Sequence, residues 1–244
     1  MRFLIIPCYN EFHRLQESKV FNCVDHLDCI VVLVNDGSTD KTQHLLQRIS
    51  SVRPAAIKVL NLERNLGKGE AVRAGINFAI SQGASEVGFC DADFAVDHHD
   101  LVRIFSKLDE SSLSYGVIGS RVAVAGSTIK RSVFRHFFGR IFATLVSAIL
   151  KQDVYDTQCG AKAFRINTTT IYVFSQPFHS RWAFDVEILG RINRLTNREP
   201  SSVIELPLLR WIEQTGSKLS VFSRLTTALE LFKIRRSLQS WKSL

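Results

Sequence analysis

The chain has 244 residues, which is enough for one large α/β domain or for a domain with appendages. Its hydrophobic fraction of 45% and its charged fraction of 22% are those of an ordinary globular protein. Lysine and arginine outnumber the acids by 31 to 23, and the net charge of +8 favours anionic partners such as phosphates, acidic lipid or nucleic acid.

The cysteines and the apolar runs exclude several classes of protein. Five cysteines, an odd number without a Cys-x-x-Cys pair, indicate neither a disulfide framework nor a zinc site, and a reducing cytosol is the natural compartment. The amino-terminal apolar run is too short for a signal peptide. The longest apolar run, from Ile141 to Leu150, is about half of the roughly 20 residues that a membrane-spanning helix needs. We therefore expect no transmembrane segment.

Strand–helix units repeat through the first hundred residues. Apolar runs predict buried strands at 3–6, 29–34, 57–60 and 86–89, and helical patterns predict helices at 12–24, 41–49 and 69–80. Continuous apolar strands that alternate with helices indicate a parallel sheet covered on both faces. The alternation loosens after Val96. We expect a single domain over 1–244, with a nucleotide-sugar-binding half (1–97), an acceptor half (98–219) and a basic amphipathic tail (220–244).

Asp91 and Asp93 directly follow the predicted strand at 86–89. In open α/β sheets, ligands bind in the crevice beyond the carboxyl ends of the strands. Carboxylates gathered there repel each other unless a cation or hydrogen-bond donors compensate them. Mg²⁺ and Mn²⁺ prefer carboxylate oxygens and retain sites for phosphate oxygens. The pair predicts a metal–diphosphate site, although an isolated Asp-x-Asp is also common in solvated turns.

Polar residues follow the other predicted strands as well. Tyr9 can stack on a base, Glu11 can accept a hydrogen bond from ribose or base, and Asp36 can accept an N–H from a pyrimidine. Each could instead be turn chemistry, but three polar strand ends on one sheet edge favour a nucleotide site. The segment 65–70 is neither a P-loop nor a dinucleotide fingerprint. It offers a backbone able to approach phosphate, with Lys68 as a mobile cation.

These segments resemble those of a known family. Four of them occur in the order and spacing of family 2 inverting glycosyltransferases with the GT-A fold, namely Pro7-Cys8-Tyr9-Asn10-Glu11, 34–40, 65–69 and 91–93. Three later segments are similar to those of the polyprenyl-phosphate sugar synthases, especially the dolichyl-phosphate β-glucosyltransferases, namely 156–162, 181–187 and 216–219. Relatives in this group often carry an N-terminal membrane helix or C-terminal spans, and we expect neither within these residues.

The resemblance implies a Rossmann-like, mostly parallel sheet flanked by helices, and transfer of glucose or mannose to a polyprenyl phosphate. The donor would be a nucleotide sugar of the UDP-glucose or GDP-mannose type, with Mg²⁺ or Mn²⁺ as cofactor. Asp91 and Asp93 would be the metal ligands, and Asp91 would also face the sugar or ribose. The residues implied around the donor are Pro7, Tyr9, Asn10, Glu11, Asp36, Lys68, Asp91 and Ala92. The family inverts by single displacement, so we expect no covalent intermediate.

The acceptor decides which further residues act. A phosphate acceptor is already anionic and needs cations to position it, and Arg121, Arg131 and Arg135 are the candidates. Each could equally be a solvated arginine. An alcohol acceptor would need a general base, for which Asp185 is the candidate by family analogy. We expect Glu187 and its i+4 neighbour Arg191 to form a surface salt bridge. Trp182 is either an acceptor platform or core.

Two basic amphipathic segments, 129–150 and 221–241, predict helices in the C-terminal half. Each can pack on the sheet or lie at a membrane interface, with cations at the headgroups. Together they favour peripheral attachment to the cytoplasmic face of a membrane. A homodimer remains open.

Three other classes of function remain as alternatives. A family 2 enzyme without membrane attachment would act on a saccharide or protein hydroxyl, with Asp185 as its base. A nucleic-acid-binding module would explain the charge, but no groove-reading motif is present and we expect no nucleic-acid partner. A non-catalytic lipid-surface protein would have no need of the two aspartates at 91 and 93.

Overall fold

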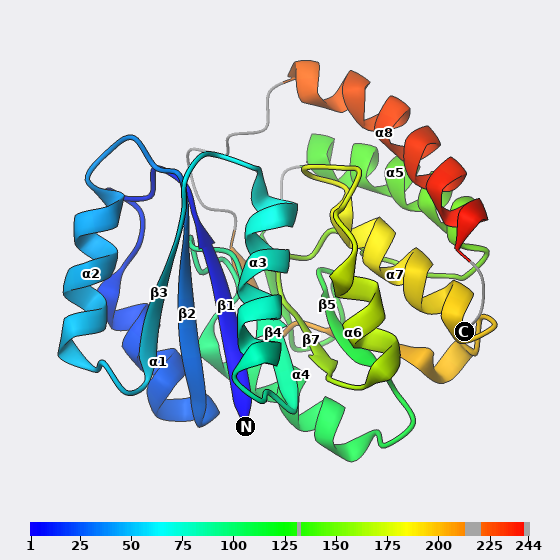
Figure 1. Cartoon of the computed structure of the whole chain (residues 1–244). Helices are drawn as coiled ribbons and strands as arrows, with labels where there is room; N and C mark the ends of the chain where they lie inside the picture. Colours follow the sequence, from blue (N-terminus) through cyan, green and yellow to red (C-terminus); the bar gives the residue numbers. More distant parts are fainter. Residues whose placement is uncertain (131–132, 213–220, 242–244) are drawn as a thin grey trace.

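The computed structural model describes residues 1–130, 133–212 and 221–241, except for the side chains of 133–138, 200, 221–229 and 240. Its main sheet has the strand order β3-β2-β1-β4-β7-β5-β8 (Figure 1). β7 is antiparallel to both β4 and β5, whereas the other neighbouring strands are parallel. The strands are β1 (Arg2–Cys8), β2 (Cys29–Asp36), β3 (Ile57–Leu62), β4 (Glu86–Phe89), β5 (Gly116–Ser120), β7 (Lys162–Arg165) and β8 (Val203–Pro207).

Successive side chains of the central strands point to opposite faces of the sheet, and helices cover both faces. Leu4 and Ile6 of β1 pack in one cluster with apolar residues of α1, α2 and α4, while Phe3 and Ile5 pack in another with those of α3, α6 and α7. The predicted parallel sheet covered on both faces is therefore confirmed. The helices concerned are α1 (Glu17–Leu27), α2 (Thr42–Val52), α3 (Lys68–Ser81), α4 (His98–Glu110), α6 (Thr168–Ser175) and α7 (Phe184–Leu195).

The first helix begins later than the sequence pattern predicts. Residues 11–15 form a turn in which the backbone N–H groups of Arg14 and Leu15 donate to the carbonyl of Glu11. The backbone N–H of Phe12 donates to the Asp40 carboxylate, 3.4 Å away. This turn keeps residues 12–16 out of the helix, and the predicted start at residue 12 is wrong. It also makes Arg14 part of a loop at the carboxyl end of β1.

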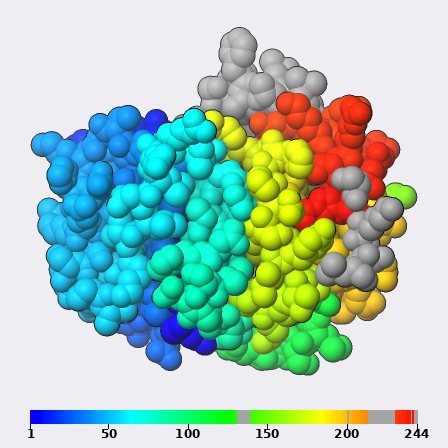
Figure 2. Space-filling view, in the orientation of Figure 1, coloured from blue at the N-terminus to red at the C-terminus, as the bar shows by residue number. Residues whose placement is uncertain are grey.

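Two long helices pack beyond the sheet in the C-terminal half, α5 (Val133–Leu150) and α8 (Val221–Ser240). Ile118 of β5, Val146 of α5, Val186 of α7 and Ile234 of α8 belong to one buried cluster. The orange-to-red α8 and the green α5 lie along the same side of the molecule in Figure 1, and Figure 2 shows the red surface at that side. No helix of the described residues has the length and apolarity to cross a membrane.

The segment 129–150 is not one helix, contrary to prediction. Residues Thr128–Lys130 form β6, which pairs in parallel with β9 (Arg210–Ile212), and Ile129 is aligned with Trp211. The β-branched Thr128 and Ile129 suit a strand. The helix begins at Val133 instead. The short 3₁₀ helix η1 (Pro200–Ser202) leads into β8.

Candidate active site

The carboxyl ends of β1, β2 and β4 lie side by side, because these strands are neighbours in the parallel part of the sheet. The loops after β1 and β2 are joined by hydrogen bonds: the Asn10 N–H donates to Ser38 Oγ at 3.1 Å, and the Thr39 N–H donates to Asn10 Oδ1 at 2.9 Å. The crevice beyond such ends is where ligands bind. Predicted donor residues from three segments therefore share this edge, namely Pro7, Tyr9, Asn10 and Glu11, then Asp36, and then Asp91, Ala92 and Asp93.

Asp36 fixes the glycine-rich loop. Its buried carboxylate accepts hydrogen bonds from the backbone N–H groups of Leu66 at 2.7 Å and Gly67 at 2.9 Å, and from Asn65 Nδ2 at 3.0 Å. Burial raises the pKa of Asp36, and the two backbone donors oppose that rise. Gly67 has φ +97°, which a side chain would strain. Asp36 therefore anchors the loop so that α3 begins at Lys68.

Two half-buried ion pairs occupy the edge after β4. Lys68 Nζ lies 2.6 Å from Asp91 Oδ1, and Arg14 Nη2 lies 3.1 Å from Asp93 Oδ2. Burial raises the pKa of Asp93, and the negative charge of Asp91 raises it further. Burial alone would lower the pKa of Lys68, but Asp91 and Asp185 reverse the effect and raise it. Each carboxylate is thus compensated by a side chain from another segment.

The two aspartates fit a hard divalent cation. Both supply carboxylate oxygen, and a cation would offset the burial and the charge of Asp91, which together raise the pKa of Asp93. A Cβ atom at position 160 would lie 2.1 Å from Asp91 Oδ2, so the space beside this carboxylate depends on Gly160. No group of three or more His, Cys, Asp or Glu side chains that could hold a metal occurs among the described residues.

Arg121 and Asp156 form a bidentate ion pair at the end of β5. Arg121 Nε lies 2.6 Å from Asp156 Oδ2, and Arg121 Nη2 lies 2.7 Å from Oδ1. Burial alone would raise the pKa of Asp156, but the charge and hydrogen bonds of Arg121 prevail and lower it to about 2. Glu205 of β8 accepts from the backbone N–H of Asp156 at 2.7 Å. A predicted phosphate-binding arginine is therefore already held by a carboxylate.

Asp185, the predicted base, forms a buried ion pair with Lys162 of β7. Lys162 Nζ lies 2.7 Å from Asp185 Oδ1, and the two side chains are 0% and 4% exposed. Lys162 Nζ also donates to the carbonyl oxygen of Cys159 at 2.5 Å. This pair joins the first turn of α7 to the sheet, beneath the edge that carries Lys68 and Asp91. A buried carboxylate with a charged partner suits positioning better than proton transfer.

Two further predictions about α7 and its preceding loop have definite outcomes. Glu187 and Arg191 form the expected ion pair at 2.7 Å, but both side chains are fully buried, so the predicted surface location is wrong. Arg191 also donates to the carbonyls of Val173, Gln176 and Pro177, which explains why it lies inside. Trp182 is 43% exposed and does not belong to the core.

Arg131 lies outside the described residues. Arg135 belongs to α5, and its side chain is not described. The residues that sequence reasoning missed are Arg14 and Lys162. Arg14 was assigned to a helix that begins later, and Lys162 is the first residue of β7, a short strand that no periodic pattern in the sequence marks.

Residues 3–170 match the model of the family described as "Glycosyl transferase family 2". The chain belongs to this family and is a glycosyltransferase that depends on a nucleotide sugar. A dolichyl-phosphate beta-glucosyltransferase of Drosophila melanogaster is 34% identical over 248 residues, covering 95% of this chain and 73% of that protein. The protein of the same name from Saccharomyces cerevisiae is 31% identical, covering 89% of this chain and 69% of its own.

Solved structures share the fold. A mannosyltransferase from Pyrobaculum calidifontis, in complex with GDP-Man and Mn²⁺, has a TM-score of 0.66 at 19% identity and covers 100% of this chain and 65% of its own. Glucosyl-3-phosphoglycerate synthase from Mycobacterium tuberculosis, in complex with Mn²⁺, UDP and its product, has a TM-score of 0.64 at 16% identity. That match covers 98% of this chain and 77% of the synthase chain. The predicted single GT-A α/β fold is confirmed.

Proposed function

We propose that the protein transfers a hexose, glucose or mannose, from a nucleotide-diphosphate sugar to a polyprenyl phosphate of the dolichyl type. The observation that carries this proposal is the edge after β4, where Asp91 and Asp93 stand beside Lys68 and Arg14. Carboxylates and cations together suit a metal-bound diphosphate, which the cations contact directly. The names of the Drosophila and yeast relatives support the lipid acceptor.

The donor would bind across the carboxyl ends of β1, β2 and β4. Pro7, Tyr9, Asn10 and Glu11 would contact the nucleotide, and Asp36 would anchor the loop and accept an N–H from the base. The ammonium group of Lys68 lies beside Asp91. When the donor binds, Lys68 would move from that carboxylate to the nearby diphosphate. Ala92, between the two aspartates, is buried and would set the spacing of the pair.

Asp91 and Asp93 would hold Mg²⁺ or Mn²⁺, as the Mn²⁺ in related solved structures suggests. When bound, the metal supplies Lewis-acid neutralisation of the departing diphosphate. Lys68 and Arg14 would share that charge from the protein side. The transfer would invert the anomeric carbon in a single displacement, in which the acceptor oxygen forms its bond as the bond to the diphosphate breaks.

A phosphate acceptor needs cations, and the described candidate is Arg121. Two of its nitrogens are held by Asp156, which fixes the plane of the guanidinium and leaves Nη1, which has no hydrogen-bond partner among the described residues, for an acceptor oxygen. Arg131 and Arg135 stay candidates from sequence alone. The ion pair of Asp185 with Lys162 favours a phosphate acceptor over an alcohol, because an alcohol would need a carboxylate able to take a proton.

The division of labour between halves also remains a proposal. Residues 1–97 would bind the donor, 98–219 the acceptor, and 220–244 the membrane surface. Ile141, Leu145 and Phe232 are exposed apolar residues of α5 and α8, and Lys233 and Arg236 are exposed cations of α8. We infer peripheral attachment to the cytoplasmic face of a membrane from this mixture. A homodimer is compatible with the same surface.

The test is a screen of UDP-glucose and GDP-mannose with Mn²⁺ or Mg²⁺ against a polyprenyl phosphate, with glycolipid formation as the readout. We expect transfer that a chelator abolishes, and we expect Asp185→Asn to retain substantial activity across neutral pH. Transfer only to a water-soluble alcohol, lost in Asp185→Asn, would instead identify an enzyme that needs a general base.

Vesicle binding tests the attachment. The protein should bind anionic vesicles and be released progressively by salt, since each cation near the surface contributes roughly 1 kcal/mol and is screened. Lys233→Gln with Arg236→Gln should weaken binding only in part, because other cations remain. Equal binding to neutral and anionic vesicles at every salt concentration would contradict the role of the cations.

A further inference from the structure

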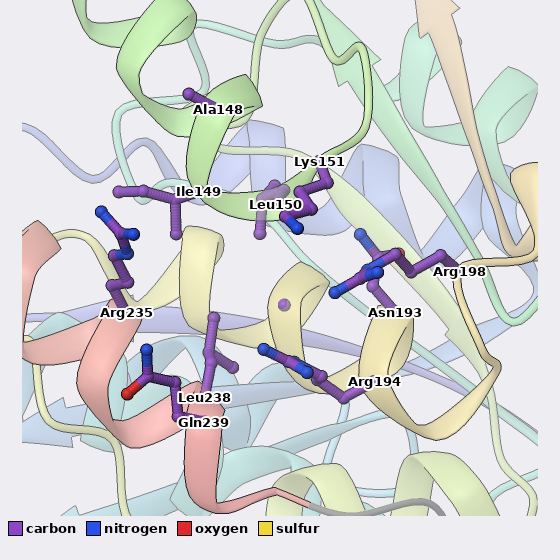
Figure 3. Close-up of a pocket in the computed structure, with 11 residues that line it drawn as sticks. Ala148, Ile149, Leu150, Lys151, Asn193, Arg194, Arg198, Arg235, Leu238 and Gln239 are labelled. Carbon is purple, nitrogen blue, oxygen red and sulfur yellow. The ribbon is translucent and has the colours of Figure 1, made fainter.

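A cavity of about 280 Å³ lies where the C-terminal turns of α5, α7 and α8 meet. Figure 3 shows arginine and lysine side chains from different segments around it. The sheet edge with Asp91 is elsewhere. Asp185 in the first turn of α7 belongs to that site, and Asn193, eight residues further along the same helix, lines the cavity. At a rise of 1.5 Å per residue the two are about 12 Å apart. The lining residues are Ala148, Ile149, Leu150, Lys151, Gly190, Asn193, Arg194, Arg198, Arg235, Leu238 and Gln239.

The lining is strongly cationic. Lys151, Arg194, Arg198 and Arg235 contribute four positive charges, and no carboxylate is among the lining residues. Within the described part of the chain, none of these four side chains forms an ion pair with an acid. This differs from the sheet edge, where Lys68 and Arg14 each contact an aspartate. Like charges that converge without counter-charges favour an anion between them.

An alternative explanation is that these cations only compensate the partial negative charge at the C-terminal ends of the three helices. A helix C-terminus carries about half a negative charge, so three ends supply roughly −1.5 against +4. An excess of positive charge therefore remains after the helix dipoles are counted. Lys151 and Arg198 also have φ of +54° and +61°, a backbone conformation that glycine or asparagine adopts most easily. The chain thus uses cations at two positions where the backbone favours other residues.

A buried polar side chain contributes to the wall of the cavity. Asn193 is 2% exposed, and its Nδ2 donates to Gln152 Oε1 at 2.7 Å. Its Oδ1 is buried without a hydrogen-bond partner among the described residues. A buried carbonyl oxygen is costly unless a donor reaches it. A phosphate ester with a hydroxyl group, or a protonated phosphate, can supply that donor. Ile149, Leu150 and Leu238 add apolar wall.

We propose that this cavity, formed by the ends of α5, α7 and α8, is a second anion site that binds a phosphate group. The phosphate is either free in solution or carried by the headgroup of an anionic lipid. Arginine suits this ligand through paired N–H donors, and Arg194 and Arg198 come from one helix and the turn after it. The site does not depend on the acceptor proposed for transfer, since it lies at the opposite end of α7 from Asp185.

The experiment compares two variants that lose the same charge. Arg194→Gln with Arg198→Gln removes two cations from the cavity, whereas Lys41→Gln with Arg48→Gln removes two exposed cations at α2 that do not line it. Inorganic phosphate is titrated into each protein at constant ionic strength and followed by ³¹P NMR. We expect the cavity variant to bind phosphate at least about tenfold more weakly than the unmodified protein, and the control variant to bind it normally. Circular dichroism melting checks that both variants fold.

A second experiment determines whether the phosphate is soluble or part of a lipid. It measures binding of the same variants to phosphatidylcholine vesicles with and without phosphatidic acid. Weaker binding of the cavity variant than of the control to the acidic vesicles would identify a lipid headgroup. A difference in the phosphate titration alone would identify a soluble phosphate. Equal effects of the two variants in both arms, or phosphate binding that only Lys68→Gln removes, would overturn the proposal. So would an unmodified protein that binds neither phosphate nor the acidic vesicles.

Discussion

Two lysine–aspartate pairs in this site have almost the same length and very different surroundings. Lys68 and Asp91 are 2.6 Å apart with side chains 21% and 40% exposed, while Lys162 and Asp185 are 2.7 Å apart and nearly inaccessible. An exposed pair contributes at most about 1 kcal/mol, because water solvates both partners when they separate. Breaking a buried pair leaves an uncompensated charge inside. The first pair can therefore exchange partners with a ligand, and the second holds the site together.

The same contrast separates Asp93 from Asp156. Burial and the nearby Asp91 raise the pKa of Asp93, whereas Arg121 lowers the pKa of Asp156 to about 2 despite its burial. Asp93 thus carries an unfavourable charge that a metal can relieve. Asp156 carries a charge that the protein already satisfies. Groups that can bind ligands therefore lie close to groups that support the fold. The direction of the pKa shift distinguishes the two kinds of group.

The largest expected effect is on transfer by Asp93→Ala. Loss of this ligand should reduce activity by about a thousandfold or more, since charge on the leaving diphosphate would lose its compensation. The free energy of unfolding should change by less than about 1 kcal/mol, because the aspartate is not core volume. Transfer assays beside urea unfolding measure both, with the exposed Asp25→Ala as control. Full activity in the presence of a chelator would contradict the metal role.

The next effect tests the buried pair. Lys162→Met should lower the free energy of unfolding by about 3–5 kcal/mol, since Asp185 would be left charged and unpaired. Lys68→Met should lower it by less than about 1 kcal/mol while impairing donor binding. Lys162→Met combined with Asp185→Leu should recover much of the lost stability. Urea unfolding measures all three variants, and similar losses for Lys162→Met and Lys68→Met would remove the distinction between the pairs.

A smaller effect concerns Asp156. Its folded pKa of about 2 lies below the ordinary value of 3.8, so it contributes stability above pH 3.8 that is lost as pH falls towards 2. The shift corresponds to about 2 kcal/mol. Asp156→Asn should destabilise the protein at neutral pH and flatten the dependence of stability on pH in this window. Unfolding curves at several acidic pH values provide the measurement, and an unchanged slope in the variant would show that other groups dominate.

The smallest effect is on metal affinity. Because the pKa of Asp93 is raised, it keeps its proton at a higher pH than an ordinary aspartic acid, and the metal must displace that proton. Affinity for Mn²⁺ should therefore fall by up to about tenfold per pH unit below that pKa. Calorimetric titration at a series of acidic pH values would detect the loss, and an affinity that does not change with pH would contradict it.

The sequence predicted the donor edge because strands that alternate with helices form a parallel sheet, whose strands end at the same edge. Asp36, Asp91 and the residues after β1 had to meet once those strands were neighbours. It could not predict how the carboxylates are shared among cations, since Arg14 and Lys162 reach them across the fold. Asp36 shows what the sequence could not predict. Its location at the donor edge was predicted, but its hydrogen bonds to the loop at 65–67 come from backbone N–H groups, which no side-chain pattern marks. The roles of the donor residues remain predictions.

The antiparallel strand β7 limits the order in which the chain can complete its sheet. The residues of β4 have all been synthesised at Phe89. The edge of β4 that faces β7 is covered only later, when Arg165 pairs with Glu86 and Lys162 pairs with Phe89. Until then a nascent chain exposes the unpaired N–H and C=O groups of β4, and these groups can form hydrogen bonds with a strand of another chain. Sequence-distant pairing of this kind slows folding and prolongs exposure. A chain that stops before β7 should therefore aggregate during synthesis, even though it contains every donor-binding segment.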